Sequence, residues 1–280
     1  MTTPWFADLL PDDPAGETAR REIRDGSADA PDDWPARAVE SGFAESESDY
    51  YATLREATIS ATREAVAERE RADDQQLVHA VRAMDDAART ANELAERLAE
   101  WAGSLFDAPG TGIDGARNVA AMDPADPTEE RAVSLAERVV DLAAERDDLE
   151  SYIRERAPTV YPNLAAMAGP VLATRLVALV GGLESLAKKP SGTVQVLGAE
   201  DALFAHLRGH APSPKHGIIF THEYVRGTRR EDRGSAARAF AGKLAIAARI
   251  DHYAGDYRPE LHAELRERIE TIQARGEDSD

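Results

Sequence analysis

The sequence contains no cysteine and very little lysine. Without cysteine there are no disulfides, no thiolate metal sites and no cysteine nucleophiles. Lysine occurs only at Lys188, Lys189, Lys215 and Lys243, so arginine supplies most of the 33 basic residues. Against them stand 52 acidic residues, which give the 280-residue chain a net charge of −19. Many carboxylates with few lysines are typical of salt-adapted proteins, whose acidic surfaces keep them hydrated, and we expect a halophilic source.

Long apolar runs and enzyme motifs are also missing. No run approaches the ~18 residues of a membrane span, and the N-terminus, MTTPWFADLLPDD, lacks the basic and apolar regions of a signal peptide. We therefore expect a soluble, cytoplasmic protein with no membrane partner. The sequence contains no HExxH, GxxxxGK[ST] or GxSxG motif, and His206 and His210, four residues apart, are only a weak metal signal. We expect no catalytic residues, no metal and no cofactor; an acidic helical hydrolase using His and Asp is the alternative.

Charge is distributed unevenly along the chain. Residues 1–156 carry 17 basic and 37 acidic residues, whereas residues 157–275 carry 16 basic and 12 acidic residues. A net-positive third of so acidic a chain suggests a surface that binds a polyanion. A chance fluctuation on a solvated surface is the alternative.

Hydrophobic periodicity predicts an all-α fold. We expect an antiparallel two-helix coiled coil followed by a helical domain, with a short N-terminal region. The predicted divisions are a short acidic N-terminal region at 1–72, a coiled-coil hairpin at 73–156, a binding domain at 157–275 and an acidic tail at 276–280.

The hairpin prediction depends on two helices with alternating four- and three-residue apolar spacing. The first covers residues 73–105, and the second begins with Thr128 as its cap and ends before Pro158, joined by an irregular connector at 106–128. Arg146 interrupts the second seam, and we expect its stem to pack while its charged end reaches water. The apolar faces are wider than one hairpin covers, so they predict a homodimer through Leu77, Val81, Met84, Leu98, Leu135, Val139, Leu142 and Leu149.

The third region is expected to be helical with two irregular segments. Thr193–Leu197 is predicted to be a short extended link, and Gly217–Phe220 a buried strand or extended core segment. Helices are predicted at Ala199–Leu207 and Arg233–Tyr253.

Glycines and hydrogen-bond donors gather in this third region. Arginine side chains and helix N-termini commonly bind phosphate. The alternative is that these side chains pair with local acids on solvated helices. Together with neighbouring positions of the helix at Ala199, the candidate RNA- or ribonucleoprotein-binding residues are Lys188, Lys189, Gln195, Gly198, Ala199, Glu200, Ala202, Leu203, Phe204, His206, Lys215, His216, Arg230, Arg233, Arg238 and Lys243.

Three runs in this region resemble the Nop domain of the Nop family, in particular its archaeal box C/D scaffold members: PSGTVQVLGAEDALFAHL, PKHGIIFTH and RGSAARAFAGKLAIAARID. The resemblance covers about Asn163–Tyr257, and QLVHAVRAMDDAARTANELAERLAEW is similar to the family's coiled-coil helices. Asp201 and Ala205 stand where the family usually has Lys and Arg.

The resemblance implies a non-enzymatic scaffold for RNA-guided 2′-O-methylation of rRNA or tRNA. The implied partners are a box C/D guide RNA, a kink-turn-binding subunit of the ribosomal-protein type, the methyltransferase fibrillarin at the N-terminal region, and a second copy of the chain through the coiled coil. A Nop-domain scaffold of another RNA-processing particle is the alternative.

Overall fold

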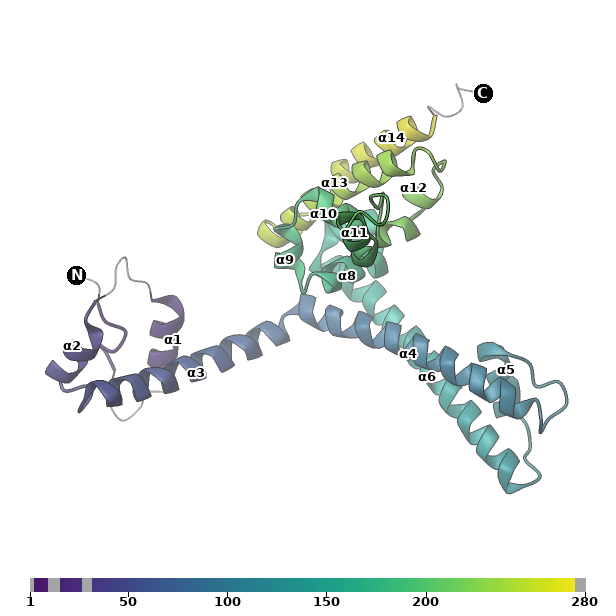
Figure 1. The fold of residues 1–280 in the computed structure, drawn as a ribbon, viewed down its shortest axis with the longest axis horizontal. Helices are drawn as coiled ribbons and strands as arrows, with labels where there is room; N and C mark the ends of the chain where they lie inside the picture. Colours follow the sequence, from purple (N-terminus) through teal and green to yellow (C-terminus); the bar gives the residue numbers. More distant parts are fainter. Residues whose placement is uncertain (1–2, 10–15, 27–31, 275–280) are drawn as a thin grey trace. The chain divides into compact units, whose positions relative to one another are not determined.

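The computed structural model describes residues 3–9, 16–26 and 32–274, and the regular elements in these ranges are all helical, which confirms the predicted fold class (Figure 1). The chain divides into two compact units, Met1–Ala72 and Asp73–Asp280. The predicted acidic tail at 276–280 lies outside the described residues.

The first unit is a small helical unit with an aromatic core. Its helices are α1 (Glu17–Asp25), α2 (Trp34–Glu40) and α3 (Glu47–Arg71). Ser46 caps α3 by accepting a hydrogen bond from the Asp49 N–H at 3.2 Å. The rings of Phe6 and Phe43 stack at 4.9 Å beside Tyr50, which is buried where α3 begins. Trp5 belongs to the same cluster, so aromatic side chains form the centre of the unit's core.

The second unit begins with a helical hairpin made by α4 (Asp73–Ala102), α5 (Gly112–Ala120) and α6 (Pro127–Val160) (Figure 1). α4 and α6 are antiparallel, because Arg156 near the end of α6 lies 3.4 Å from Asp73 at the start of α4, while Leu98 and Val133 share one core cluster at the other end. The expectation of an irregular connector was wrong in part. α5 forms within it and covers the far end of the hairpin, where Val119 is buried.

Both predicted boundaries of α6 need correction. Its N-cap is Asp126, whose carboxylate accepts the N–H groups of Thr128 and Glu129 at 2.7 and 2.9 Å. Pro158 lies inside the helix, which continues to Val160. Ala157 on the preceding position is fully buried, so tertiary packing outweighs the proline's preference to end the helix.

The hairpin seam lies as predicted on α4 but is shifted on α6. Leu77, Val81, Met84 and Leu98 of α4 are buried. On α6, the buried positions are Ala132, Val133, Ala136, Val139, Ala143, Ile153 and Ala157, whereas Leu135, Leu142 and Leu149 are half-buried. Alanine on both helices allows a close approach of the backbones. Most residues predicted to join two copies are therefore used inside one chain, and dimerisation stays a prediction that now depends on the three leucines.

The rest of the second unit packs around one long helix, α13. The elements are α7 (Pro162–Ala168), α8 (Pro170–Leu179), α9 (Leu183–Ala187), α10 (Ser191–Val196), α11 (Glu200–Leu207), the 3₁₀ turn η1 (Ile218–Thr221), α12 (Glu223–Arg226), α13 (Arg233–Tyr253) and α14 (Pro259–Ala274). α7, α9, α10, α12 and α14 all contact α13. Phe240 and Leu244 are buried at its centre among alanines that let the neighbours approach.

The two segments predicted to be extended are different in the structure. Thr193–Leu197 falls mostly within α10, and Ile218–Thr221 forms a 3₁₀ turn after Gly217. The Gly217 N–H donates to the Gln195 carbonyl at 2.8 Å, and the Ile218 N–H donates to the Leu197 carbonyl at 2.7 Å. These bonds attach the segment to the end of α10. The predicted division of 73–275 into two domains stays a prediction, since α6 runs across the boundary.

Within the described ranges, no single helix is long and apolar enough to cross a membrane. The pair α7 and α8 would reach that length and composition only together, and the pair is bent by 115°. Leu164 and Leu176, one from each helix, are fully buried in the core cluster that also contains α13. Their apolar character is therefore explained by packing.

A buried carboxylate connects the end of α13 to the start of α7. Asp251 accepts hydrogen bonds from the backbone N–H groups of Asn163 and Leu164 at 3.0 and 2.9 Å, and from the Asn163 side chain at 2.6 Å. Asn163 in turn binds the Asp256 carbonyl and the Arg258 N–H, both at 2.8 Å. Burial raises the pKa of Asp251, and the hydrogen bonds from Leu164 and Asn163 oppose this shift. A residue 88 positions away thus caps α7.

We expect Asp251→Asn to lower the free energy of unfolding by about 1–3 kcal/mol, because the amide nitrogen cannot accept and leaves a buried N–H without a partner. Urea denaturation measures the change. Asp256→Asn is the matched control, since the Asp256 side chain is exposed and only its carbonyl takes part. Equal stability of the two variants would show that the carboxylate does not hold α7.

Candidate nucleic-acid interface

α11 is a surface helix with exposed apolar side chains. None of its residues is buried, and Phe204 and Leu207 are 56% and 70% exposed. Gly198, with φ of +79°, starts the turn into the helix, and its N–H donates to Glu200 Oε1 at 2.8 Å. His206 Nδ1 lies 3.0 Å from the Ala211 carbonyl and fastens the other end. A helix that is held by hydrogen bonds at both ends and exposes an apolar face is typical of an interaction surface.

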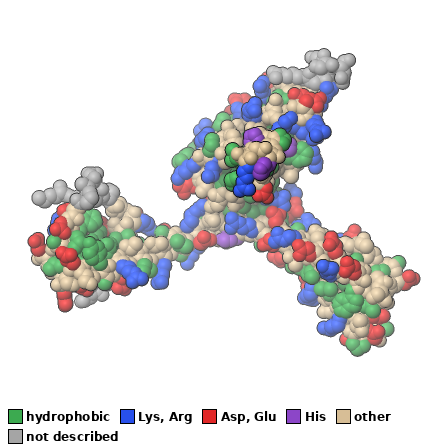
Figure 2. Space-filling view, in the orientation of Figure 1, with side chains coloured by type: hydrophobic (Ala, Val, Ile, Leu, Met, Phe, Trp, Pro, Cys, Tyr) green, Lys and Arg blue, Asp and Glu red, His purple; other side chains and the backbone are tan. Residues whose placement is uncertain are grey.

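A groove of about 700 Å³ lies beside α11, between α10 and the start of α13. Four of the predicted binding residues line it together: Gln195, Leu203, Lys215 and Arg238. Gln195 Nε2 donates to the Lys215 carbonyl at 2.7 Å and so positions that lysine. In the part of the chain that the structure describes, neither Lys215 nor Arg238 makes an ion pair, and both are exposed. Figure 2 shows basic, histidine and apolar side chains gathered over this face.

The arginine loop, defined as residues 226–233, runs from the end of α12 to the start of α13. Arg233 points inward: its Nε donates to the Thr228 carbonyl at 3.0 Å and its Nη2 to the Arg226 carbonyl at 3.2 Å. Its guanidinium also lies 5.3 Å from the centre of the Phe220 ring. These contacts hold the loop in shape. Arg226, Arg229 and Arg230 of this loop are exposed, and the described residues show no ion pair for Arg226 or Arg230.

The remaining predicted cations lie away from the groove. Lys188 on the α9 side pairs with Glu184 at 2.5 Å, and Lys243 pairs with Glu264 of α14. The Lys189 carbonyl accepts from Arg249, which is roughly 16 Å along α13 from Arg238. The structure therefore gathers only part of the predicted set into one surface. For Lys188 and Lys243, pairing with local acids is the observed arrangement.

The aromatic support of this surface was not found from the sequence. His216 stacks on Phe220 with ring centres 4.6 Å apart. Burial lowers the pKa of His216, and the charges of Arg233 and Lys215 lower it further, which favours a neutral ring. Phe220 thus lies in contact with both His216 and Arg233 and joins the groove to the arginine loop. In the sequence, the PKHGIIF run that contains His216 and Phe220 predicted only a buried core segment and not this ring stacking.

A family model described as "Nop: snoRNA binding domain, fibrillarin" matches residues 46–273. The chain belongs to the Nop family. An uncharacterized NOP5 family protein of Methanocaldococcus jannaschii is 49% identical over 142 residues, which are 50% of this chain and 34% of the relative. Nucleolar protein 58 of Scheffersomyces stipitis is 38% identical over 148 residues, 51% of this chain and 29% of the relative. The chain therefore matches about a third of each of these relatives.

A solved structure described as "Crystal structure of fibrillarin/Nop5p complex" is also similar. It matches with a TM-score of 0.54 and 25% identity, over 91% of this chain and 92% of that chain. The similarity thus extends over both units of this Nop-family chain. The predicted family resemblance is confirmed.

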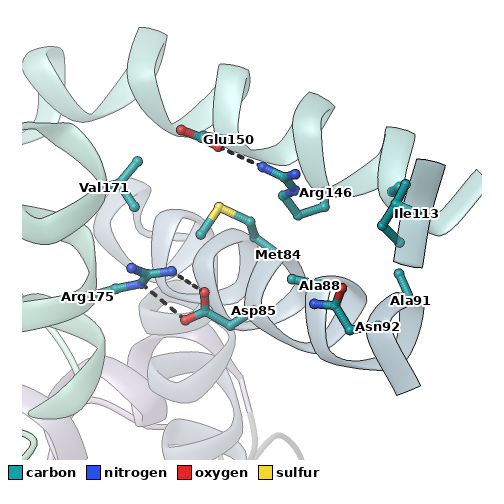
Figure 3. A pocket seen from close by; sticks show the side chains of 11 residues that line it. Met84, Asp85, Ala88, Ala91, Asn92, Ile113, Arg146, Glu150, Val171 and Arg175 are labelled. Carbon is teal, nitrogen blue, oxygen red and sulfur yellow. Dashed lines mark hydrogen bonds and ion pairs between the residues drawn. The ribbon is translucent and has the colours of Figure 1, made fainter. Parts of the chain in front are cut away.

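A pocket of about 290 Å³ lies in the middle of the hairpin, beside α8 (Figure 3). Arg146 is half-buried, as expected for its place in the seam, and lies 3.4 Å from Glu150. Arg175 forms a bidentate ion pair with Asp85 on the opposite wall of the pocket. Because both arginines are already paired with carboxylates, the pocket offers no free charge to a ligand. No group of three metal-ligating side chains occurs in the ranges that the structure describes.

A histidine cap lies beneath the arginine loop. His222 Nδ1 accepts the Tyr224 N–H at 3.2 Å and caps α12, and the Tyr224 hydroxyl lies 3.1 Å from His262 Nε2. Burial lowers the pKa of both His222 and His262. Protonation of His222 would put a proton on the capping nitrogen and break the bond.

We expect the protein to lose stability as the pH falls below about 6.5. A histidine whose folded pKa is lowered contributes stability that is full above its unfolded pKa and is lost as the pH falls through the folded pKa. His222→Asn keeps a capping oxygen but does not titrate, so its unfolding free energy should fall less between pH 7.5 and 5. Urea titrations across that range compare the two chains. Parallel pH profiles would contradict a titrating cap.

Proposed function

We propose that this Nop-family chain is a non-catalytic scaffold of a box C/D ribonucleoprotein that directs RNA-guided 2′-O-methylation. The observation that carries the proposal is the exposed apolar face of α11 beside the groove of Lys215 and Arg238. A junction of RNA with a protein subunit needs both parts, because cations bind phosphates while apolar side chains bury against protein. The names of the family model and of Nucleolar protein 58 agree with such a particle.

Each surface has a role in this proposal. Phe204 and Leu207 pack against the kink-turn-binding subunit, while Lys215, Arg230 and Arg238 bind phosphates of the guide RNA. Asp201 in the first turn of α11 favours a protein neighbour there, because a carboxylate repels phosphate.

The first unit, residues 1–72, is proposed to hold fibrillarin. Support comes from the similar solved structure, which is described as a fibrillarin complex, and from the extent of that match over this chain. The aromatic core of Phe6, Phe43 and Tyr50 gives the unit a compact body of its own on which a partner can dock.

We expect Phe204→Ala and Arg230→Ala to weaken binding to a kink-turn RNA with its bound subunit in different ways. Each lost phosphate contact should reduce the slope of log affinity against log salt by about 0.7–0.9, so Arg230→Ala should matter most at low salt. Phe204→Ala should matter more near 1 M salt, where the Debye length is only ~3 Å. Fluorescence titrations at two salt concentrations give both effects.

If the same variant lost more affinity at both salt concentrations, the proposed roles of Arg230 in charge and Phe204 in shape would be contradicted. Arg249→Ala is a matched control for charge loss, because its guanidinium faces the carbonyls of Ala187 and Lys189 outside the groove. RNA sequencing after affinity capture of the chain would separate box C/D guide RNAs from the RNAs of another processing particle.

We also propose that the hairpin joins two copies through the half-buried leucines of α6. Leu135, Leu142 and Leu149 follow one another at seven-residue spacing and are not fully covered by the chain itself.

Leu142→Glu should give a folded monomer in light scattering. The carboxylate would be buried without a partner in the dimer interface, whereas it stays solvated in the monomer. Leu98→Glu should instead unfold the hairpin, since Leu98 is 1% exposed. Circular dichroism checks the fold of both variants. A folded dimer of Leu142→Glu would move the interface elsewhere.

A further inference from the structure

The groove beside α11 contains charges of both signs. Lys215 and Arg238 line it, and so does Glu231 of the arginine loop, whose carboxylate is exposed. Among the residues that the structure describes, none of these three side chains has a partner in an ion pair, although all three face one groove. The groove therefore suits a ligand that brings an anion for the two cations and a hydrogen-bond donor for the carboxylate.

The backbone around Glu231 is held in a hydrogen-bonded turn. The N–H groups of Asp232 and Arg233 both donate to the Arg229 carbonyl at 3.0 Å. The side chain of Arg233 adds its two bonds to carbonyls of the same loop. The position from which Glu231 reaches into the groove is thus fixed before a ligand binds.

The rest of the groove has a partly apolar lining. Val196, Leu203 and Pro214 are half-buried in its wall. Pockets for small molecules and cofactors have about 300–1,000 Å³, with apolar walls and a few placed polar groups, and this groove of about 700 Å³ fits that description. An unstacked nucleotide has the matching parts, because its base has apolar faces and a polar edge and its phosphate is charged.

We propose that the groove binds one unpaired nucleotide of the RNA and that Glu231 selects guanine there. Lys215 and Arg238 bind the phosphate, while the base lies against the apolar wall with its edge toward Glu231. The proposal rests on the RNA-binding function proposed above and adds which part of the RNA the groove takes.

Guanine is the base that a carboxylate fits best. Its Watson–Crick edge carries two neighbouring donors, N1–H and the 2-amino group, and a carboxylate can accept two parallel N–H bonds. Uracil offers a single N–H between two carbonyl oxygens. In adenine and cytosine the amino group adjoins a ring nitrogen with a lone pair, which repels a carboxylate.

Glu231 should therefore act in opposite directions on different ligands. Its charge repels phosphates, so a polyanion without a suitable base binds more weakly because of it. A guanine offsets this repulsion with charge-assisted hydrogen bonds. One carboxylate thus separates a ligand with the right base from a ligand that brings charge alone.

The test uses the full chain and Glu231→Gln, which removes the charge but keeps the size of the side chain. Glu267→Gln is the matched control, because this exposed carboxylate of α14 lies outside the groove. The probes are heparin and hexaribonucleotides of uridine in which one central residue is guanosine, inosine or uridine. Inosine lacks only the 2-amino group of guanosine. Fluorescence titrations are made at the lowest salt at which circular dichroism shows every variant folded.

We expect the unchanged chain to bind the guanosine hexamer about tenfold more tightly than the uridine hexamer, with inosine between them. Glu231→Gln should bind heparin and the uridine hexamer roughly two- to fivefold more tightly, since a repelling charge is gone. The same variant should lose the preference for guanosine. Glu267→Gln should keep it.

The inference is overturned if the unchanged chain does not prefer the guanosine hexamer, or if the preference survives in Glu231→Gln. Lys215→Ala/Arg238→Ala separates this failure from that of the proposed function. If that variant weakens binding to a kink-turn RNA with its bound subunit, the groove is a phosphate site and only its selection of a base is wrong. If it leaves that binding unchanged, the proposed RNA surface itself fails.

Discussion

The lobe around α13 depends on one buried carboxylate. Asp251 lies at the end of α13 and binds the first N–H groups of α7, so it fixes the angle between the central helix and the segment that leaves the hairpin. Its ionised form is costly to bury, which is why its pKa is raised, yet the N–H groups it satisfies would be costly to leave unpaired. Asp74 does the same on the other side, where it accepts the Leu183 N–H at 2.9 Å. Long-range caps thus replace the local caps that these short helices lack.

This arrangement also positions the candidate interface. α13 begins at the arginine loop and carries Asp251 in its last turn, so its orientation determines where Arg238 and the loop lie. α10 packs on the same helix and carries Gln195, which holds Lys215 at the groove. The groove is thus held by its supporting helix and by this backbone contact, and Lys215 and Arg238 remain exposed.

Sequence patterns predicted the structure best where it depends on residues close together in the chain. The four-and-three spacing of Leu77, Val81 and Met84 lies within one helix and correctly marked its buried face. The sequence of α6 contains two overlapping apolar stripes, one of leucines and one of alanines. The prediction chose the leucines, but the close approach of the helix backbones buries Ala136 and Ala143 instead. α10 was missed because β-branched Thr193, Val194 and Val196 have low helix propensity, while contacts with α13 decide its conformation.

Prediction of the site was limited by orientation. An apolar Leu203, Phe204 and Leu207 pattern is usual for a buried helix, and only the family resemblance indicated that Phe204 serves a partner. A sequence also does not show whether an arginine side chain points toward the protein or toward solvent. Arg233 binds two carbonyls of its own loop, whereas Arg230 remains exposed nearby. Neither the caps by Asp251 nor the contact of Gln273 with Thr228 could be predicted, since each joins residues 45 or more positions apart.

For the RNA-binding surface proposed above, the strong acidity of the chain makes shape as necessary as charge. A net charge of −19 repels polyanions at long range, and high salt removes both that repulsion and the attraction of the arginines. What salt cannot screen is contact: the apolar face of α11 and the packing of His216 and Arg233 against Phe220. An interface built on fixed aromatic and apolar groups, with a few exposed cations to orient phosphates, retains its specificity under conditions in which an interface of charges alone would lose it.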